Sequence, residues 1–146
     1  EQYGAGPYGT MFLAQLGAEV IKIEPPGVGD TARQVGPHFL RPGESVYFQS
    51  FNLNKRSITL DLNKAEGQTV LHRLTAGAHA VVNNLRGDIP DKLGLTYAAL
   101  APHNPAIVCA HLSAYGRDNE RARWPGYDYL MQAEAGYLSL TGDPQG

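Results

Sequence analysis

Hydrophobic residues recur along this chain in two spacings, one typical of helices and the other typical of strands. Spacings of three and four residues predict two longer helices, at residues 7–16 and 64–76. Asn63 is expected to cap the second of them. The same spacing predicts shorter helical segments at residues 45–51, 88–93, 97–101 and 127–135.

Runs of β-branched and other apolar residues predict strands at residues 19–24, 57–62, 80–82 and 106–112. In the second of these runs apolar side chains alternate with Ser, Thr and Asp, which is the pattern of a half-buried strand. Because strands and helices alternate along the chain, we predict an α/β fold. It would have a Rossmann-like, mostly parallel sheet with helices on both faces, and such sheets bind ligands at the carboxyl ends of their strands.

Two segments rich in turn-forming residues lie between or after these elements. Residues 27–44 contain many Gly and Pro residues and are expected to form a long surface loop. Residues 141–146 also have the composition of a turn, and the chain begins at Glu1, a few residues before a Gly-rich turn. We therefore expect the chain to be a piece of a longer protein.

The composition argues against several kinds of partner. A formal net charge of −2 gives no basic field for nucleic acid. No apolar run approaches the roughly 20 residues of a membrane-spanning helix. The single cysteine, Cys109, excludes an internal disulfide and is typical of a reducing compartment such as the cytoplasm. The five histidines lack a spacing such as H-x-x-x-H, so we expect no metal site.

A glycine-rich motif near the start of the chain has two interpretations. Residues 4–9, Gly-Ala-Gly-Pro-Tyr-Gly, match the dinucleotide-binding pattern G-x-G-x-x-G, and Glu24 ends the next predicted strand, where a ribose-binding acid would lie. The motif would then bind a nicotinamide cofactor. Alternatively, it is a tight turn that starts a helix with Pro7 at its first position. The strand that should precede a dinucleotide-binding motif is absent from this chain.

Polar residues at the ends of predicted elements are candidates for binding an anionic ligand. Lys55 and Arg56 precede the second predicted strand, where they either bind an anion or form its solvated entrance. Asn84 and Arg86 follow the third predicted strand, at the end where such sheets bind ligands. Asp128 opens the last predicted helix, where the helix dipole alone favours a carboxylate.

Short motifs cover nearly the whole chain and follow one another in a characteristic order. They are Ala5-Gly6-Pro7, residues 16–24, Gly29-Asp30, Tyr47-Phe48, residues 54–58, Leu60-Asp61-Leu62, Gly67, Asn84-Leu85-Arg86, Leu93-Gly94-Leu95, Asn104-Pro105, Gly126-Tyr127-Asp128 and Leu140-Thr141-Gly142. In this order they resemble the N-terminal part of the class III CoA-transferases of the formyl-CoA and carnitine type. That family also includes α-methylacyl-CoA racemases.

The resemblance implies a two-domain protein whose two subunits interlock as a homodimer. Residues 1–146 would be a partial N-terminal, CoA-binding, Rossmann-like domain, without its first strand and without the second domain. The expected contacts with coenzyme A involve three groups of residues, at the glycine-rich turn, along the nucleotide and at the pantetheine or acyl end. These groups are Gly4 and Ala5; Leu60, Asn63, Asn84, Leu85, Arg86 and Lys92; and Pro125 and Tyr127.

Five residues, in four places along the chain, depart from those that some family members carry. Pro25 stands in place of an Arg, Asn63 in place of a Lys, and Leu85 in place of an aromatic residue. Gly87-Asp88 replaces Pro-Gly, directly after Arg86. All four changes bear on how strongly phosphate and adenine would bind.

The implied reaction moves coenzyme A from an acyl-CoA to a small carboxylic acid through an aspartyl covalent intermediate, without a metal. The nucleophilic Asp is expected beyond Gly146, and Asp128 would have only a supporting role. Racemases of the family carry His where this chain has Tyr127, and a Tyr with a pKa of about 10 is a poor base at neutral pH. Transferase is therefore favoured over racemase, and a non-catalytic CoA-binding fragment is a third interpretation.

Overall fold

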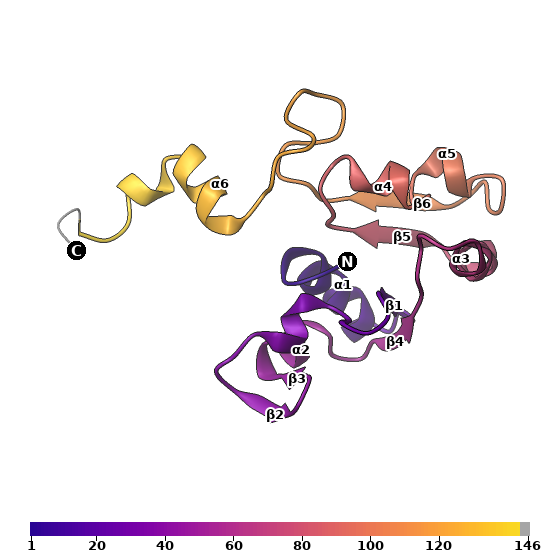
Figure 1. Cartoon of the computed structure of the whole chain (residues 1–146), viewed down its shortest axis with the longest axis horizontal. Coiled ribbons are helices and arrows are strands. Elements are labelled where there is room, and N and C mark those ends of the chain that lie inside the picture. The colour runs from indigo at the N-terminus through magenta and orange to yellow at the C-terminus, as the bar shows by residue number, and fades with distance from the viewer. Residues whose placement is uncertain (144–146) are drawn as a thin grey trace.

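Two pairs of short parallel strands organise the molecule (Figure 1). β1 (Ile21–Glu24) pairs with β4 (Arg56–Thr59), and β5 (Ala80–Asn83) pairs with β6 (Val108–His111). The computed structural model describes residues 1–143, so part of the turn expected at the chain's end lies outside the described residues. Within the described part, the two pairs are not hydrogen-bonded to each other. The α/β class is confirmed, and the predicted parallel sheet is present as two separate pairs.

Helical connections explain why the strands of each pair run parallel, because a parallel pair needs a crossover. Between β5 and β6 the chain forms two short helices, α4 (Ile89–Lys92) and α5 (Tyr97–Leu100), which lie along one side of the pair in Figure 1. Between β4 and β5 it forms α3 (Ala65–Gly77). α2 (Val46–Phe51) lies in the crossover between β1 and β4.

The hydrophobic core lies around the β5–β6 pair. Its buried members are Leu71 of α3, Leu100 of α5, and Leu95 and Ile107 from the flanking turns. Val81 of β5 packs against them. These contacts pack α3 and α5 against the β5–β6 pair.

The two longer helices are confirmed, with corrections at their starts. α1 (Ala5–Gln15) begins two residues before the predicted position, so Pro7 lies inside its first turn, where a missing N–H is tolerated. Asn63 does not cap α3, because Lys64 takes the N-cap position and makes no side-chain cap. Asn63 instead donates its backbone N–H and its Nδ2 to Asp61 Oδ1, at 3.1 and 3.2 Å. The Asp61 carboxylate is the nearer acceptor in this turn, so the Asn63 side chain binds to it and does not cap the helix.

Residues 27–44 are more regular than the expected long loop. They contain a 3₁₀ turn, η1 (Thr31–Gln34), and a small antiparallel hairpin of β2 (Phe39–Arg41) and β3 (Glu44–Ser45). The residues of β2 are all exposed, so no buried face marks the strand in the sequence. Gly43, with φ of 75°, allows the tight turn between the two strands.

The last helix, α6 (Asp128–Glu134), extends away from the strand pairs together with η2 (Tyr137–Ser139) (Figure 1). Neither element contains a buried residue. An ion pair of 3.3 Å between Arg121 and Glu134 connects α6 to the preceding loop. The helix predicted at residues 127–135 is therefore present, but the described residues give it almost no packing partner.

Candidate functional site

The carboxyl ends of β5 and β6 are joined by a partly buried polar contact. Asn83 is 2% exposed, and its Nδ2 lies 2.8 Å from Nδ1 of His111 on β6. Burial, followed by the charge of Arg117, lowers the pKa of His111. The neutral imidazole can accept the amide proton at Nδ1, so the contact fixes the two strand ends against each other.

Two cations directly after β5 converge on one carboxylate. Arg86 Nε and Nη2 lie 2.6 and 3.1 Å from the two oxygens of Asp88, and Lys92 Nζ lies 2.7 Å from Asp88 Oδ2. Hydrogen bonds from Arg86 and then from Lys92 hold the pKa of Asp88 well below its usual range. The structure therefore brings the predicted binding residues Arg86 and Lys92 together, through a partner that the sequence analysis noted only as a departure.

Asn84, another predicted binding residue, holds the segment that precedes α1. Its Oδ1 accepts the N–H of Gln2 at 2.7 Å, and its Nδ2 donates to the carbonyl of Gln2 at 2.7 Å. A Cβ at Gly6 would lie 2.7 Å from Asn84 Oδ1, so only glycine allows this approach. The amide of Asn84 is thus satisfied within the chain, and it positions the glycine-rich turn beside the end of β5.

The residue before the glycine-rich turn has a strained backbone. Tyr3 has a φ of 63°, which is uncommon for a residue with a side chain, and its N–H donates to Asp30 Oδ1 at 2.9 Å. Gly4 follows at the N-cap of α1, and Ala5 is the first, exposed residue of that helix. The two predicted ligand contacts, Gly4 and Ala5, therefore lie at the start of α1. The backbone just before them is fixed by the hydrogen bond from Tyr3 to Asp30.

The predicted residues Leu60, Asn63 and Leu85 share one cavity. It has a volume of about 1010 Å³ and is lined along its length by residues of β1 and β5. Leu60 donates its N–H to the carbonyl of Glu24 at 3.0 Å, just after β4 ends. The cavity thus has residues of both parallel strand pairs in its lining.

Pro125, Tyr127 and Asp128 lie apart from the other predicted residues. All three are exposed, and Asp128 accepts a hydrogen bond from Gln132 within its own helix. The Tyr127 ring stacks on Tyr129, with centroids 5.8 Å apart. Within the described residues, the ion pairs of Arg86 and Lys92 are both with Asp88, so this segment adds nothing to the site formed there.

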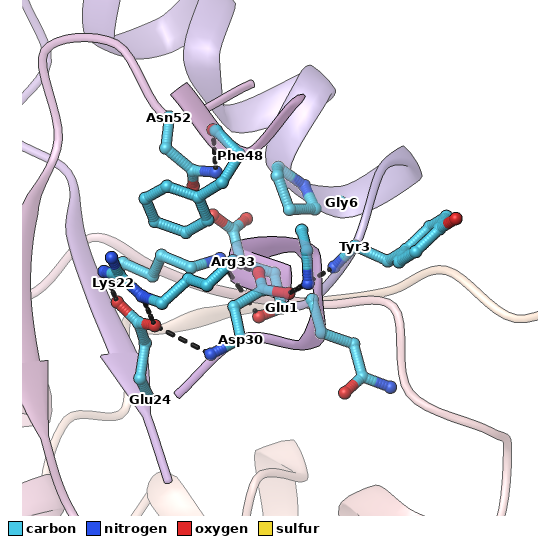
Figure 2. Close-up of polar contacts among 12 residues, drawn as sticks. Glu1, Tyr3, Gly6, Lys22, Glu24, Asp30, Arg33, Phe48 and Asn52 are labelled. Atoms are coloured by element: carbon cyan, nitrogen blue, oxygen red, sulfur yellow. Dashed lines mark hydrogen bonds and ion pairs between the residues drawn. The ribbon is translucent and has the colours of Figure 1, made fainter. Parts of the chain in front are cut away.

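A network of buried charges at the carboxyl end of β1 was missed by the sequence analysis (Figure 2). Lys22 is 1% exposed, and its Nζ lies 2.6 Å from Asp30 Oδ2. Glu24 is 2% exposed and accepts two hydrogen bonds of 2.7 Å from Arg33. Phe48 lies against the network, with the Arg33 guanidinium 3.9 Å from its ring centre. One signal was available, because Lys22 and Glu24 share one face of a strand of otherwise apolar residues.

Lys55 belongs to this network, which changes the interpretation of the Lys55–Arg56 pair. Lys55 Nζ lies 2.9 Å from Glu1 Oε1 and donates to the carbonyl of Pro7 at 2.7 Å. Burial lowers the pKa of Lys55, and the hydrogen bond to Glu1 opposes that shift. Arg56 is exposed and pairs with Glu19. The Lys55 ammonium is therefore used in contacts that stabilise the fold. The Lys55–Arg56 pair does not form a binding site for an anionic ligand.

Cys109 is half-buried in β6, and burial raises the pKa of its thiol. A raised pKa leaves little thiolate at neutral pH, so the thiol is a poor nucleophile. Among residues 1–143, no three His, Cys, Asp or Glu side chains are grouped as metal ligands would be. In the same residues, no helix is long and apolar enough to cross a membrane.

Comparison with solved structures places this fold in a known group. The crystal structure of a CAIB/BAIF family protein from Brucella suis matches 99% of the chain, with a TM-score of 0.89 and 37% sequence identity. The match covers 39% of that protein. At this identity and score the two chains share the fold.

Sequence comparison gives the same result. The chain is 37% identical to the succinate–glutarate CoA-transferase of Agrobacterium fabrum and 38% identical to the acetyl-CoA:oxalate CoA-transferase of Acetobacter aceti. Each match covers 97% of this chain but only 37% and 36% of the relative. The model of CoA-transferase family III matches residues 1–146. The chain therefore belongs to CoA-transferase family III, and it spans just over a third of the length of these relatives.

Proposed function

We propose that the parent protein of this chain transfers coenzyme A from an acyl-CoA to a small free carboxylic acid. The observation that carries the proposal is the convergence of Arg86 and Lys92 at the carboxyl end of β5, in a chain of CoA-transferase family III. The pair supplies the donors that phosphate groups require. The names of the two relatives above, a succinate–glutarate CoA-transferase and an acetyl-CoA:oxalate CoA-transferase, support this substrate class.

The transfer proceeds through a covalent aspartyl intermediate. An aspartate carboxylate attacks the thioester carbonyl and releases CoA as a thiolate, which leaves a mixed anhydride. The thiolate then attacks the aspartyl carbonyl of the anhydride, which releases the first acid and leaves an aspartyl-CoA thioester. The acceptor acid finally takes the CoA by the reverse steps. The nucleophile lies beyond Gly146, and Asp128 supports the reacting centre without attacking it.

The chain is a partial CoA-binding domain, and a strand that precedes Glu1 fits between β1 and β5. Arg56 and Leu60 of the β4 side donate to Val20 and Glu24, so by alternation the backbone of Ile23 faces away from β4. That unpaired edge lines the cavity opposite the edge of β5. The proposed strand, parallel to both, would end where Asn84 holds Gln2, at the carboxyl ends of its neighbours.

A second domain and a second subunit cover the remaining exposed surface. Tyr127, Tyr129, Tyr137 and Leu138 of the α6 segment are each at least 55% exposed. An aromatic surface of this kind is typical of residues that are buried by another part of an assembly. The interlocked homodimer and the cytoplasmic location belong to the same proposal, and a single Cys without a disulfide supports a reducing compartment.

The proposal is tested by trapping the intermediate on the full-length parent. The protein is incubated with an acyl-CoA, treated with hydroxylamine or borohydride, and examined by mass spectrometry. We expect one modified carboxylate, at an Asp beyond Gly146. A modified Asp128 would show that the nucleophile was placed wrongly. The absence of any adduct over a panel of acyl-CoAs would contradict the covalent route, and would favour a non-catalytic CoA-binding protein if CoA still binds.

A further inference from the structure

Asp88 lies under the two cations that follow β5. Its side chain is 10% exposed, whereas those of Arg86 and Lys92 are 42% and 61% exposed. Both of its oxygens accept hydrogen bonds from Arg86, and Oδ2 also accepts one from Lys92. The cations therefore face solvent while the carboxylate beneath them takes three of their N–H donors.

In the described structure, the Asp88 carboxylate has no structural role apart from its contacts with the two cations. Asp88 is the N-cap residue of α4, but its side chain makes no capping hydrogen bond to that helix. An Asp at this position ordinarily accepts a backbone N–H of the first turn. Its carboxylate instead accepts three hydrogen bonds from the two cations. The Asp88 carboxylate therefore serves as a hydrogen-bond partner of Arg86 and Lys92, and it does not cap the helix.

A carboxylate that binds Arg in this geometry resembles a bound phosphate. The guanidinium presents two parallel N–H donors to either anion, and the ammonium adds a point charge. We propose that Asp88 is an internal competitor of phosphate, which occupies the donors of Arg86 and Lys92 until a phosphate group of coenzyme A displaces it. The proposal rests on the proposed function, because it takes CoA as the ligand.

The competition sets affinity in two ways. Asp88 reduces the formal charge of the three side chains from +2 to +1, which weakens the attraction for an incoming phosphate. It also requires that the two-point contact with Arg86 be released before a phosphate can take those donors. Asp88 also holds the side chains of Arg86 and Lys92 in place. Asn has the same shape and keeps one oxygen that can accept their hydrogen bonds, so it would preserve part of this effect. Removal of the charge is therefore the larger effect.

The test is calorimetric titration of the full-length parent with CoA and with dephospho-CoA. We expect Asp88→Asn to bind CoA roughly three- to tenfold more tightly than wild type, the range that release of two surface ion pairs allows. The affinity of the variant should also fall more steeply with salt, because one more cation is free to meet phosphate. A gain with CoA alone assigns the 3′-phosphate to the pair, and a gain with both ligands assigns the diphosphate. Unchanged or weaker binding overturns the proposal.

Three further variants keep the result unambiguous. Glu44→Gln removes the same charge from an exposed ion pair with Arg41 on the β2–β3 hairpin, and its CoA affinity should stay at the wild-type value. Asp88→Ser, which also lacks the charge, should reproduce the gain if Asp88→Asn fails to fold. Arg86→Ala should lose roughly 10- to 100-fold in affinity, as expected for a charge-assisted contact. If wild type does not bind CoA, the proposed function fails, whereas normal binding without a gain in Asp88→Asn refutes only the competition.

Discussion

Glu24 shows how a single buried charge can be stable at the end of a strand. It accepts hydrogen bonds from Arg33, from Ser57 and from the N–H of Asp30. Burial alone would raise its pKa, but the hydrogen bonds from Arg33, Ser57 and Asp30 outweigh burial and lower the pKa from 4.5 to about 2. The ionised form is therefore the one that the fold binds.

This shift gives stability a defined dependence on pH. Because the folded pKa lies below the unfolded one, the contribution is complete above pH 4.5 and is lost as pH falls towards 2. We expect roughly 1–3 kcal/mol of unfolding free energy to disappear over that window. Chemical unfolding at a series of pH values measures it. Glu24→Gln should flatten this part of the profile, and Glu66→Gln, on the exposed surface of α3, should not. Parallel profiles for wild type and Glu24→Gln would contradict the assignment.

At the scale of elements, α3 is held against the end of β4 by a glycine. A Cβ at Gly67 would collide with the backbone carbonyl of Asp61, whereas a Cβ at Gly77, near the other end of the same helix, would meet nothing. Gly67, Leu71 and Thr75 form the buried stripe of the helix at a spacing of four. The small residue therefore sets how closely α3 approaches the turn that contains Leu62 and Asn63.

We expect Gly67→Ala to lower the free energy of unfolding by about 1–3 kcal/mol, because backbone atoms must shift to admit the methyl group. Gly77→Ala is the matched control. Its backbone φ is not positive and its site is open, so alanine should be neutral or stabilise the helix by up to about 1 kcal/mol. Denaturant unfolding of both variants makes the comparison. Equal effects would show that helix propensity, not close packing, governs Gly67.

The facing edges of β1 and β5 lead to a prediction about the proposed additional strand. In the full-length parent, the amide N–H groups of Ile21, Ile23, Ala80 and Val82 should be protected from hydrogen exchange by that strand. A chain that begins at Glu1 should exchange these amides faster, while those of Arg56 and Val108, which donate to Val20 and His79, stay protected in both. Equal protection of the four amides in the two proteins would exclude a strand at this position.

Sequence patterns predicted the elements that carry a buried face or a clear spacing. α1, α3, β1, β5 and β6 lie within a few residues of their predicted bounds, because apolar residues at fixed spacings mark them. The β2–β3 hairpin was missed because its residues are exposed. The single sheet was predicted only from the alternation of strands and helices along the chain. Alternation does not say which strand edges pair in space, so it could not predict two separate pairs.

For the candidate site, the sequence indicated which residues could bind an anion, but it did not indicate which residues they contact in the fold. Arg86 and Lys92 were predicted as neighbours of one ligand, and the structure places them on one carboxylate. Lys55 could not be interpreted correctly, because its partner Glu1 is 54 positions away in the sequence. Asn84 was expected to meet a ligand but holds Gln2, and no local pattern distinguishes these two uses of an amide.

At the scale of the whole molecule, the candidate residues form two groups that this chain does not bring together. The cations after β5 lie at the strand ends, whereas Tyr127 and Asp128 lie at the start of α6, which extends away from them (Figure 1). A thioester can react only when its carbonyl carbon lies about 3 Å from the attacking oxygen. We therefore propose that residues of this chain bind CoA and that residues of the parent beyond it carry out the chemistry.

The most direct test is CoA exchange by the full-length parent. The protein is incubated with a panel of acyl-CoAs and isotope-labelled carboxylic acids in deuterated water, and the products are identified by mass spectrometry. We expect the label to appear in new acyl-CoA, without deuterium at the carbon next to the carbonyl, because Tyr127 is a poor base for that proton. Deuterium at that carbon without transfer of CoA would contradict the account and identify the parent as a racemase.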